Sequence, residues 1–299
     1  MTAAEVPELD LLAAHARELG SPPERAASVR RVEVRLGTDV LSALRWGTGP
    51  PEIVLFHGGG QNAHTWDGML LRSRRAAVAI DLPGHGRSSW RRDGYYRPRD
   101  NAPLVAAAVE RLAPDAEVVV GMSIGGLNAL CLAAWYPALV RRLAIVDVSP
   151  AGRPERARHL TDLSGTPEFP SFDALLARTR KLRPHVPEPA LRRSLLYNAR
   201  RLPGGRWRWR HDRGDGRLDA IYADLPSYWE VARSVRCPTT LVLGEQSPIV
   251  TPADVARYRE VIPQLDVVTV AGAGHSVQGD RPQALLDIVE RMMGDVDVL

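Results

Sequence analysis

The sequence predicts an α/β protein with a doubly wound, mostly parallel sheet and a helix-rich cap inserted between two strands of that core. Two features of the sequence indicate this class. Short, continuous apolar runs alternate with stretches of helical periodicity, which is typical of buried parallel strands in βαβ units. In addition, roughly ninety residues separate two apolar runs that should be neighbours in the sheet, far more than an ordinary crossover needs.

The first part of the chain predicts a helix and a pair of strands. Residues 8–20 have amphipathic helical spacing, which ends at Gly20 ahead of two prolines. Two runs, 29–36 and 40–46, then alternate between apolar and polar residues. Such alternation is typical of an antiparallel pair with one face exposed to solvent.

The core strands and helices follow in sequence. The predicted strands are 53–56, 76–80, 118–120, 143–146, 240–243 and 267–270, and the predicted helices are 103–113, 124–136, 252–261 and 282–293. Residues 149–236 contain helical pieces, prolines and many arginines, and we expect them to form the cap. The core is then made of residues 1–148 and 237–299.

The composition is that of an ordinary soluble globular protein, with 299 residues of which 44% are hydrophobic and 25% charged. Two cysteines are too few for a disulfide scaffold, and no apolar run reaches the length that spans a membrane. The first twenty residues lack the basic and apolar regions of a secretory signal. We therefore expect a cytoplasmic protein without a membrane partner.

The charged residues give no sign of a nucleic-acid partner. The 39 basic and 35 acidic residues are interleaved, for a net charge of +4. Lys181 is the only lysine and does not follow a glycine, which excludes a Walker-type phosphate loop. Residues 206–210 alternate arginine and tryptophan, which predicts a short cap strand with both tryptophans packed on one face. No metal-binding motif is present, so we expect neither a metal nor another cofactor.

The motif Gly121-Met122-Ser123-Ile124-Gly125 lies between a predicted buried strand and a predicted helix. In such a turn the chain bends so tightly that a Cβ atom at either flanking glycine would clash with its neighbours. The serine oxygen is then presented at the carboxyl end of the sheet, at the N-terminus of the helix. Ser123 is therefore the candidate nucleophile, and the alternative is a glycine-serine turn without chemistry.

A second glycine motif, His57-Gly58-Gly59-Gly60, follows the predicted strand 53–56 directly. Glycines at a strand end let backbone N–H groups approach a substrate oxygen, as an oxyanion hole requires. The alternatives are an ordinary glycine-rich turn or a phosphate cradle, although no G-x-G-x-x-G sequence continues into a helix here.

With these motifs, Asp81-Leu82-Pro83-Gly84-His85-Gly86-Arg87-Ser88 and Gly272-Ala273-Gly274-His275 make the chain similar to the α/β-hydrolase fold superfamily. It resembles most closely the capped branch of esterases, lactonases and C–C bond hydrolases, over residues 29–148 and 237–295. The resemblance implies a triad in the order serine, acid, histidine. It places the base at His275, just after the last predicted strand, and the oxyanion-hole N–H groups at Gly59 and Ile124.

The acid is where the sequence departs from the commoner pattern of this superfamily. Relatives usually carry an aspartate at the position of Ser247, and a serine cannot hold an imidazole as a carboxylate does. Asp147 ends the predicted strand 143–146, a position that some members use, and a carboxylate at the tip of a buried strand needs a partner such as His275. We expect Asp147 to be the acid. The alternatives are Glu245 as the acid, with Asp147 in a turn or anchoring the cap.

The expected function is that of a serine hydrolase that cleaves an ester or lactone of a small, largely apolar molecule. Ser123 forms the acyl-enzyme, His275 acts as general base and Asp147 orients the imidazole. Two alternatives use the same residues, namely C–C cleavage of a diketone-like substrate and acyl transfer or cyclisation. An alternative of another class is a scaffold that binds a ligand without catalysis.

Overall fold

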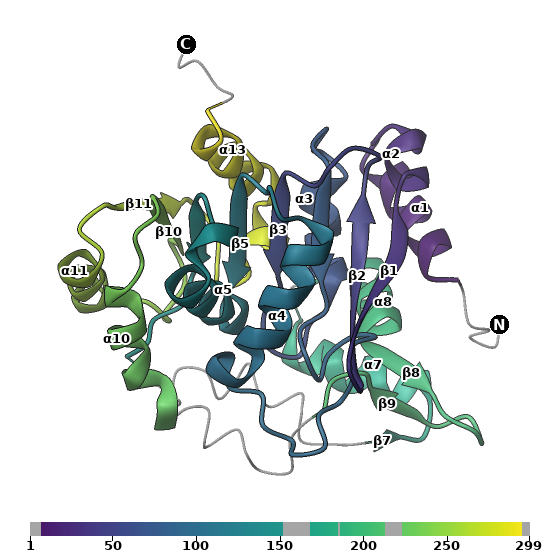
Figure 1. Ribbon diagram of the computed structural model, residues 1–299. Coiled ribbons are helices and arrows are strands. Elements are labelled where there is room, and N and C mark those ends of the chain that lie inside the picture. The colour runs from purple at the N-terminus through teal and green to yellow at the C-terminus, as the bar shows by residue number, and fades with distance from the viewer. Residues whose placement is uncertain (1–6, 152–167, 185, 213–222, 295–299) are drawn as a thin grey trace.

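The computed structural model describes residues 7–151, 168–184, 186–212 and 223–294. Its centre is an eight-stranded sheet with the strand order β1-β2-β4-β3-β5-β6-β10-β11 (Figure 1). The strands are β1 (Arg30–Leu36), β2 (Asp39–Trp46), β3 (Ile53–Phe56), β4 (Ala77–Ile80), β5 (Val118–Met122), β6 (Leu143–Val146), β10 (Thr239–Gly244) and β11 (Leu265–Val270). β2 runs antiparallel to both β1 and β4, and the remaining neighbours are parallel. The mostly parallel sheet and its antiparallel pair are thus as predicted.

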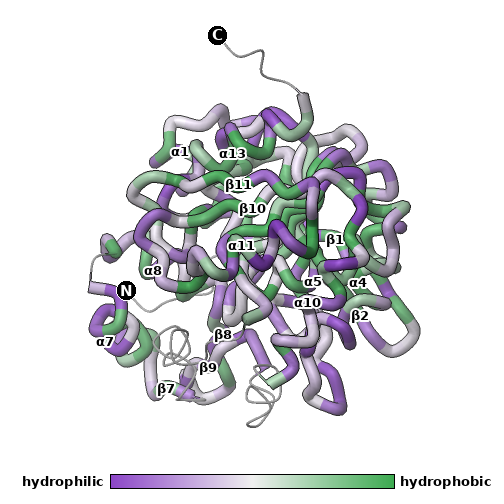
Figure 2. Tube along the Cα trace, turned by 90° about the vertical axis from the view of Figure 1, so that its left-hand side faces the viewer, coloured by the Kyte–Doolittle hydropathy of each residue, from purple (hydrophilic) through white to green (hydrophobic). Residues whose placement is uncertain are grey.

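Helices cover both faces of the sheet, which makes it doubly wound. One face carries α4 (Pro98–Leu112), α5 (Ile124–Trp135), α10 (Tyr228–Arg233) and α11 (Pro252–Val261), and the other carries α1 (Glu8–Glu18), α2 (Pro23–Ala27), α3 (Asp67–Leu70), α12 (Val277–Asp280) and α13 (Pro282–Met292). Alternate residues of each strand supply the two cores: in β3, Val54 and Phe56 face the first set, and Ile53 and Leu55 the second. Figure 2 shows the hydrophobic residues gathered along these strands.

Helix α4 begins five residues earlier than predicted, at Pro98 rather than Pro103. Both prolines satisfy the preference for proline at the start of a helix, so the sequence alone offers two possible starts. Pro98, Asn101 and Ala102 are buried in the structure. Their packing against the core favours the longer helix and offsets the backbone hydrogen bond that Pro103 cannot donate.

The segment between β6 and β10 forms a small hydrophobic core of its own. It contains α7 (Phe172–Leu182), α8 (Glu188–Asn198) and a three-stranded antiparallel sheet in the order β7 (Glu168–Phe169), β9 (Trp207–Trp209), β8 (Ala199–Arg201), and ends in η5 (Leu225–Ser227) and α10. Trp207 and Trp209 lie on one face of β9 and are both buried, as the alternation predicts. Residues 152–167, 185 and 213–222 of the predicted cap lie outside the described residues.

Within the described ranges, no helix is both long enough and apolar enough to cross a lipid bilayer.

Candidate active site

Ser123 occupies a strained turn between β5 and α5. Its φ of 54° and ψ of −124° lie in a region that residues with a side chain rarely adopt. The flanking glycines allow the turn because a Cβ atom on Gly121 would lie 2.3 Å from the carbonyl oxygen of Gly125, and one on Gly125 would lie 2.3 Å from that of Phe56. The steric prediction for both glycines is confirmed. The close backbone contacts of these glycines keep Ser123 in its strained conformation.

A Gly125→Ala substitution is expected to lower both stability and activity, because its methyl group would meet two backbone carbonyl oxygens, of Phe56 and His57, that cannot rotate away. Overpacking of this kind costs about 1–3 kcal/mol. Chemical denaturation and ester turnover measure the two effects. Gly68→Ala is the control, since a Cβ atom there makes only ordinary contacts with Pro282 at 3.6 Å, and it should change neither quantity by much. Equal behaviour of the two variants would contradict the steric account of the turn.

Asp147 and His275 are joined in the structure although they lie far apart in the sequence. The Nδ1–H of His275 donates to Oδ2 of Asp147 at 2.7 Å. Asp147 follows β6 directly, has a φ of 50° and is 1% exposed. The backbone N–H of Gly244 donates to its other oxygen, Oδ1, at 3.3 Å. A buried carboxylate with fixed donors on both oxygens holds the imidazole in one orientation and one tautomer.

Glu245 is not part of this pair. Its side chain is exposed, and Oε2 accepts the backbone N–H of Gly272 at 2.8 Å. Ser247, at the position where an aspartate was expected, instead donates from its Oγ to Oδ2 of Asp147. The sequence analysis did not predict this second donor to Oδ2. The pattern that could have predicted it is the polar residue at the position where relatives carry the acid.

Ser123 lies at the same edge of the sheet as this pair. Its backbone N–H donates to the carbonyl of Val146, the residue before Asp147, at 2.9 Å. β5 and β6 are parallel neighbours, so both side chains follow the carboxyl ends of adjacent strands. No hydrogen bond links Ser123 to His275 among the residues that the structure describes. Ser123 and the His275 imidazole therefore lie at one edge of the sheet without a direct hydrogen bond between them.

The two predicted oxyanion donors, the backbone amides of Gly59 and Ile124, form no hydrogen bond in the described part of the chain. In the glycine loop, the N–H of Gly58 donates to Oε1 of Gln61 at 3.1 Å, and that of Gly60 donates to His85. The Gly59 N–H has no acceptor within the described part of the chain, and the same holds for the N–H of Ile124. A Cβ atom built on Gly59 would lie 3.9 Å from the side chain of Ile124, so the two residues are close neighbours. Two free amides so placed can receive an oxygen that gains negative charge.

His57 is a neutral ring that is hydrogen-bonded to the glycine loop and to the segment that follows β4. Its Nδ1–H donates to the carbonyl of Gly58 at 2.8 Å, and its Nε2 accepts the N–H of Leu82 at 2.9 Å. Burial lowers the pKa of this imidazole to about 3. The ring therefore connects two loops of the site, the glycine loop and the segment that follows β4.

This lowered pKa predicts a loss of stability in acid. In the unfolded chain His57 is protonated below its ordinary pKa of about 6.5, whereas in the folded chain it stays neutral down to about pH 3. The free energy of unfolding should therefore fall as the pH drops through this window. In His57→Gln the free energy of unfolding should fall less steeply with decreasing pH than in the parent protein, because glutamine does not titrate here. Its amide oxygen can still accept the Leu82 N–H. Urea denaturation at pH 7 and pH 5 measures both slopes, and parallel slopes would contradict the prediction.

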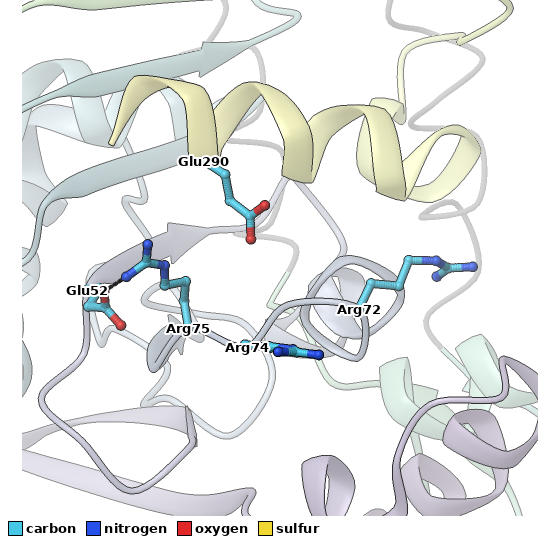
Figure 3. Close-up of a pocket in the computed structure, with 5 residues that line it drawn as sticks. All are labelled: Glu52, Arg72, Arg74, Arg75 and Glu290. Carbon is cyan, nitrogen blue, oxygen red and sulfur yellow. Dashed lines mark hydrogen bonds and ion pairs between the residues drawn. The ribbon is translucent and has the colours of Figure 1, made fainter. Parts of the chain in front are cut away.

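A hollow of about 470 Å³ lies elsewhere, near the amino ends of β3 and β4, and is lined by Glu52, Arg72, Arg74, Arg75 and Glu290 (Figure 3). Arg75 and Glu52 form an ion pair across 2.6 Å, while Arg72 and Arg74 point away from that pair. The hollow is at the opposite edge of the sheet from Ser123 and takes no part in the site.

No cluster of His, Cys, Asp or Glu in the described ranges is large enough to hold a metal ion.

Comparison with known proteins adds four findings. A family model described as the alpha/beta hydrolase family matches residues 53–288. The esterase Rv0045c of Mycobacterium tuberculosis is 42% identical over 267 residues, which cover 87% of this chain and 88% of the esterase. A crystal structure of that esterase superposes with a TM-score of 0.82 at 40% identity, covering 98% of this chain and 99% of the other. The 2-(acetamidomethylene)succinate hydrolase of Mesorhizobium japonicum is 29% identical over 266 residues, 87% of this chain and 93% of the hydrolase.

Proposed function

The chain belongs to the alpha/beta hydrolase family and is a hydrolase, and we propose that it cleaves esters or lactones of small, largely apolar molecules through an acyl-enzyme on Ser123. The observation that carries this proposal is the hydrogen bond between His275 and Asp147 at the sheet edge where the strained Ser123 emerges. An imidazole that donates from Nδ1 to a carboxylate has its Nε2 lone pair free, and this is the tautomer that a general base needs.

The roles follow from this geometry. Ser123 Oγ attacks the carbonyl carbon while Nε2 of His275 takes its proton, and Asp147 stabilises the imidazolium that results. The Gly59 and Ile124 amides receive the oxyanion. The imidazolium then returns the proton to the leaving alcohol, and water activated by the neutral ring releases the acid.

The similarity to an esterase at 42% identity over most of both chains supports ester cleavage ahead of C–C cleavage or acyl transfer. Contacts with the inserted segment support its role as a cap over a small-molecule site. The side chain of Asn62 in the glycine-loop region donates to the carbonyl of Tyr197 at 3.0 Å and to Asn198 at 2.8 Å. The Asp212 N–H donates to the carbonyl of Gly84 at 2.7 Å. These bonds join the segment to the glycine loop that carries Gly59 and to the loop that follows β4.

Steady-state kinetics with p-nitrophenyl esters of increasing acyl length, with lactones and with ring-fission diketones test the proposal. We expect turnover of esters or lactones, with kcat/KM falling once the acyl chain no longer fits beneath the cap. Turnover of diketones alone would assign the site to C–C cleavage. No turnover of any class, with an unreactive Ser123, would favour the binding scaffold.

A further inference from the structure

We propose that His85 is a positioning residue for the oxyanion hole, an inference that rests on the proposed function. His85 fixes the glycine loop by accepting a hydrogen bond from the Gly60 amide. His85 belongs to the segment that follows β4, and the amide belongs to the glycine loop that follows β3. The Gly60 N–H donates to Nε2 of His85 at 3.2 Å. In the described part of the chain, His85 forms no hydrogen bond or ring contact with Ser123, Gly59 or Ile124, so it acts through the loop.

The surroundings of His85 determine which of its nitrogens accepts. Nδ1 faces the carbonyl oxygen of Pro83 at 3.1 Å, and because a carbonyl only accepts, Nδ1 carries the proton. A neutral ring with its proton on Nδ1 has one lone pair in the plane, on Nε2, and this lone pair meets the Gly60 amide. Burial lowers the pKa of His85, which keeps the ring neutral and this acceptor available.

The bond determines which amide of the loop is left for a substrate. Gly58 donates to Gln61, Gly60 donates to His85, and Gly59 between them has no acceptor among the described residues. Gly60 has a φ of 69°, and a Cβ atom built on it would lie 3.7 Å from Cε1 of His211 in the inserted segment. Gly60 is therefore held by His85 through its amide and bordered by His211 at its α-carbon, which fixes the peptide next to Gly59.

The rings around His85 leave it little freedom to move. Its centroid lies 5.0 Å from that of His57 and 6.0 Å from that of His211, and His211 lies 5.7 Å from Trp209. These rings connect the underside of the glycine loop to the buried face of β9. Loss of the His85 acceptor should release the Gly60 amide without opening the hydrophobic core.

A released loop should slow the chemical step more than it weakens substrate binding. An oxyanion donor acts on the transition state, and a displacement of about 1 Å can cost roughly a hundredfold in rate. His85→Leu should therefore lower kcat by about 10- to 100-fold with little change in KM. His85→Gln, whose amide oxygen can accept the Gly60 N–H, should recover most of that loss.

Ser88→Ala is the matched control from the same segment. Ser88 accepts the N–H of Ser42 at 2.9 Å and donates to the carbonyl of Asp81, so its loss disturbs the segment without touching Gly60. We expect a lower Tm in this variant but an unchanged kcat. Affinity for a trifluoromethyl ketone, which binds as an oxyanion, should fall in His85→Leu and not in Ser88→Ala. Equal kcat and ketone affinity in His85→Leu and the parent enzyme would overturn the proposal, as would a loss in Ser88→Ala equal to that in His85→Leu.

Nitrogen-15 NMR of the parent enzyme tests the proposal even if His85→Leu does not fold. We expect the shifts of a neutral ring for His85, with the proton on Nδ1 and a hydrogen-bonded lone pair on Nε2. A proton on Nε2 would overturn the proposal, because that nitrogen could not accept. Failure of the proposed function is distinguished by labelling of the parent enzyme with a fluorophosphonate: absence of labelling at Ser123 rejects the nucleophile, whereas labelling with an Nε2-protonated His85 rejects only the positioning role.

Discussion

Replacing Ser123 with alanine is expected to lower kcat/KM for the best ester substrate by about 10⁴-fold or more, because no other group can form the acyl-enzyme. The residual rate should come from the two free amides and from substrate binding alone. Steady-state kinetics measure the loss, with active-site titration to exclude a trace of parent enzyme.

Stability should hardly change in this variant. The Ser123 hydroxyl makes no hydrogen bond within the described residues, and alanine keeps the Cβ atom in the same strained turn. Thermal unfolding should therefore give a Tm close to that of the parent enzyme. A variant that folds normally and retains more than a tenth of the parent activity would contradict the assignment of Ser123 as nucleophile.

Asp147→Asn is expected to lower kcat by roughly 10⁴-fold, through the tautomer of His275. The N–H of Gly244 faces Oδ1 of Asp147, so an asparagine at this position must place its carbonyl oxygen there. Its NH₂ group then faces Nδ1 of His275, which has to accept. The proton of the neutral ring moves to Nε2, and this nitrogen can no longer take the proton of Ser123.

Glu245→Gln is the matched control for this prediction, since it also exchanges one carboxylate for an amide after a neighbouring strand. The glutamine oxygen can still accept the N–H of Gly272, so kcat should stay within about threefold of the parent. Ser247→Ala should fall between the two, because Asp147 loses one of its donors but keeps its charge. A severe loss in Glu245→Gln with a mild loss in Asp147→Asn would transfer the acid role to Glu245.

The architecture was predictable because its signals are local. Parallel strands buried on both faces produce continuous apolar runs, and the runs at 53–56 and 143–146 match β3 and β6 residue for residue. The turn at Ser123 was predictable for a related reason. The glycines that the turn requires lie within two residues of the serine, so the motif itself is enough to predict the turn.

What the sequence could not supply depends on contacts between distant segments. Ser247 reaches Asp147 across 100 positions of sequence, and His211 borders Gly60 from an inserted segment whose packing no periodicity reveals. The positive φ of Asp147 was equally hidden, because no glycine marks it. The start of α4 was misplaced for a different reason, since two prolines gave the same local signal and burial decided between them.

Intact-mass spectrometry of the enzyme after brief reaction with a slowly turned-over p-nitrophenyl ester tests the central claim most directly. We expect a mass increase equal to one acyl group, located by peptide mapping at Ser123, absent from Ser123→Ala and short-lived in the presence of water and an intact His275. An acyl group found on another residue, or rapid hydrolysis in Ser123→Ala, would contradict the account.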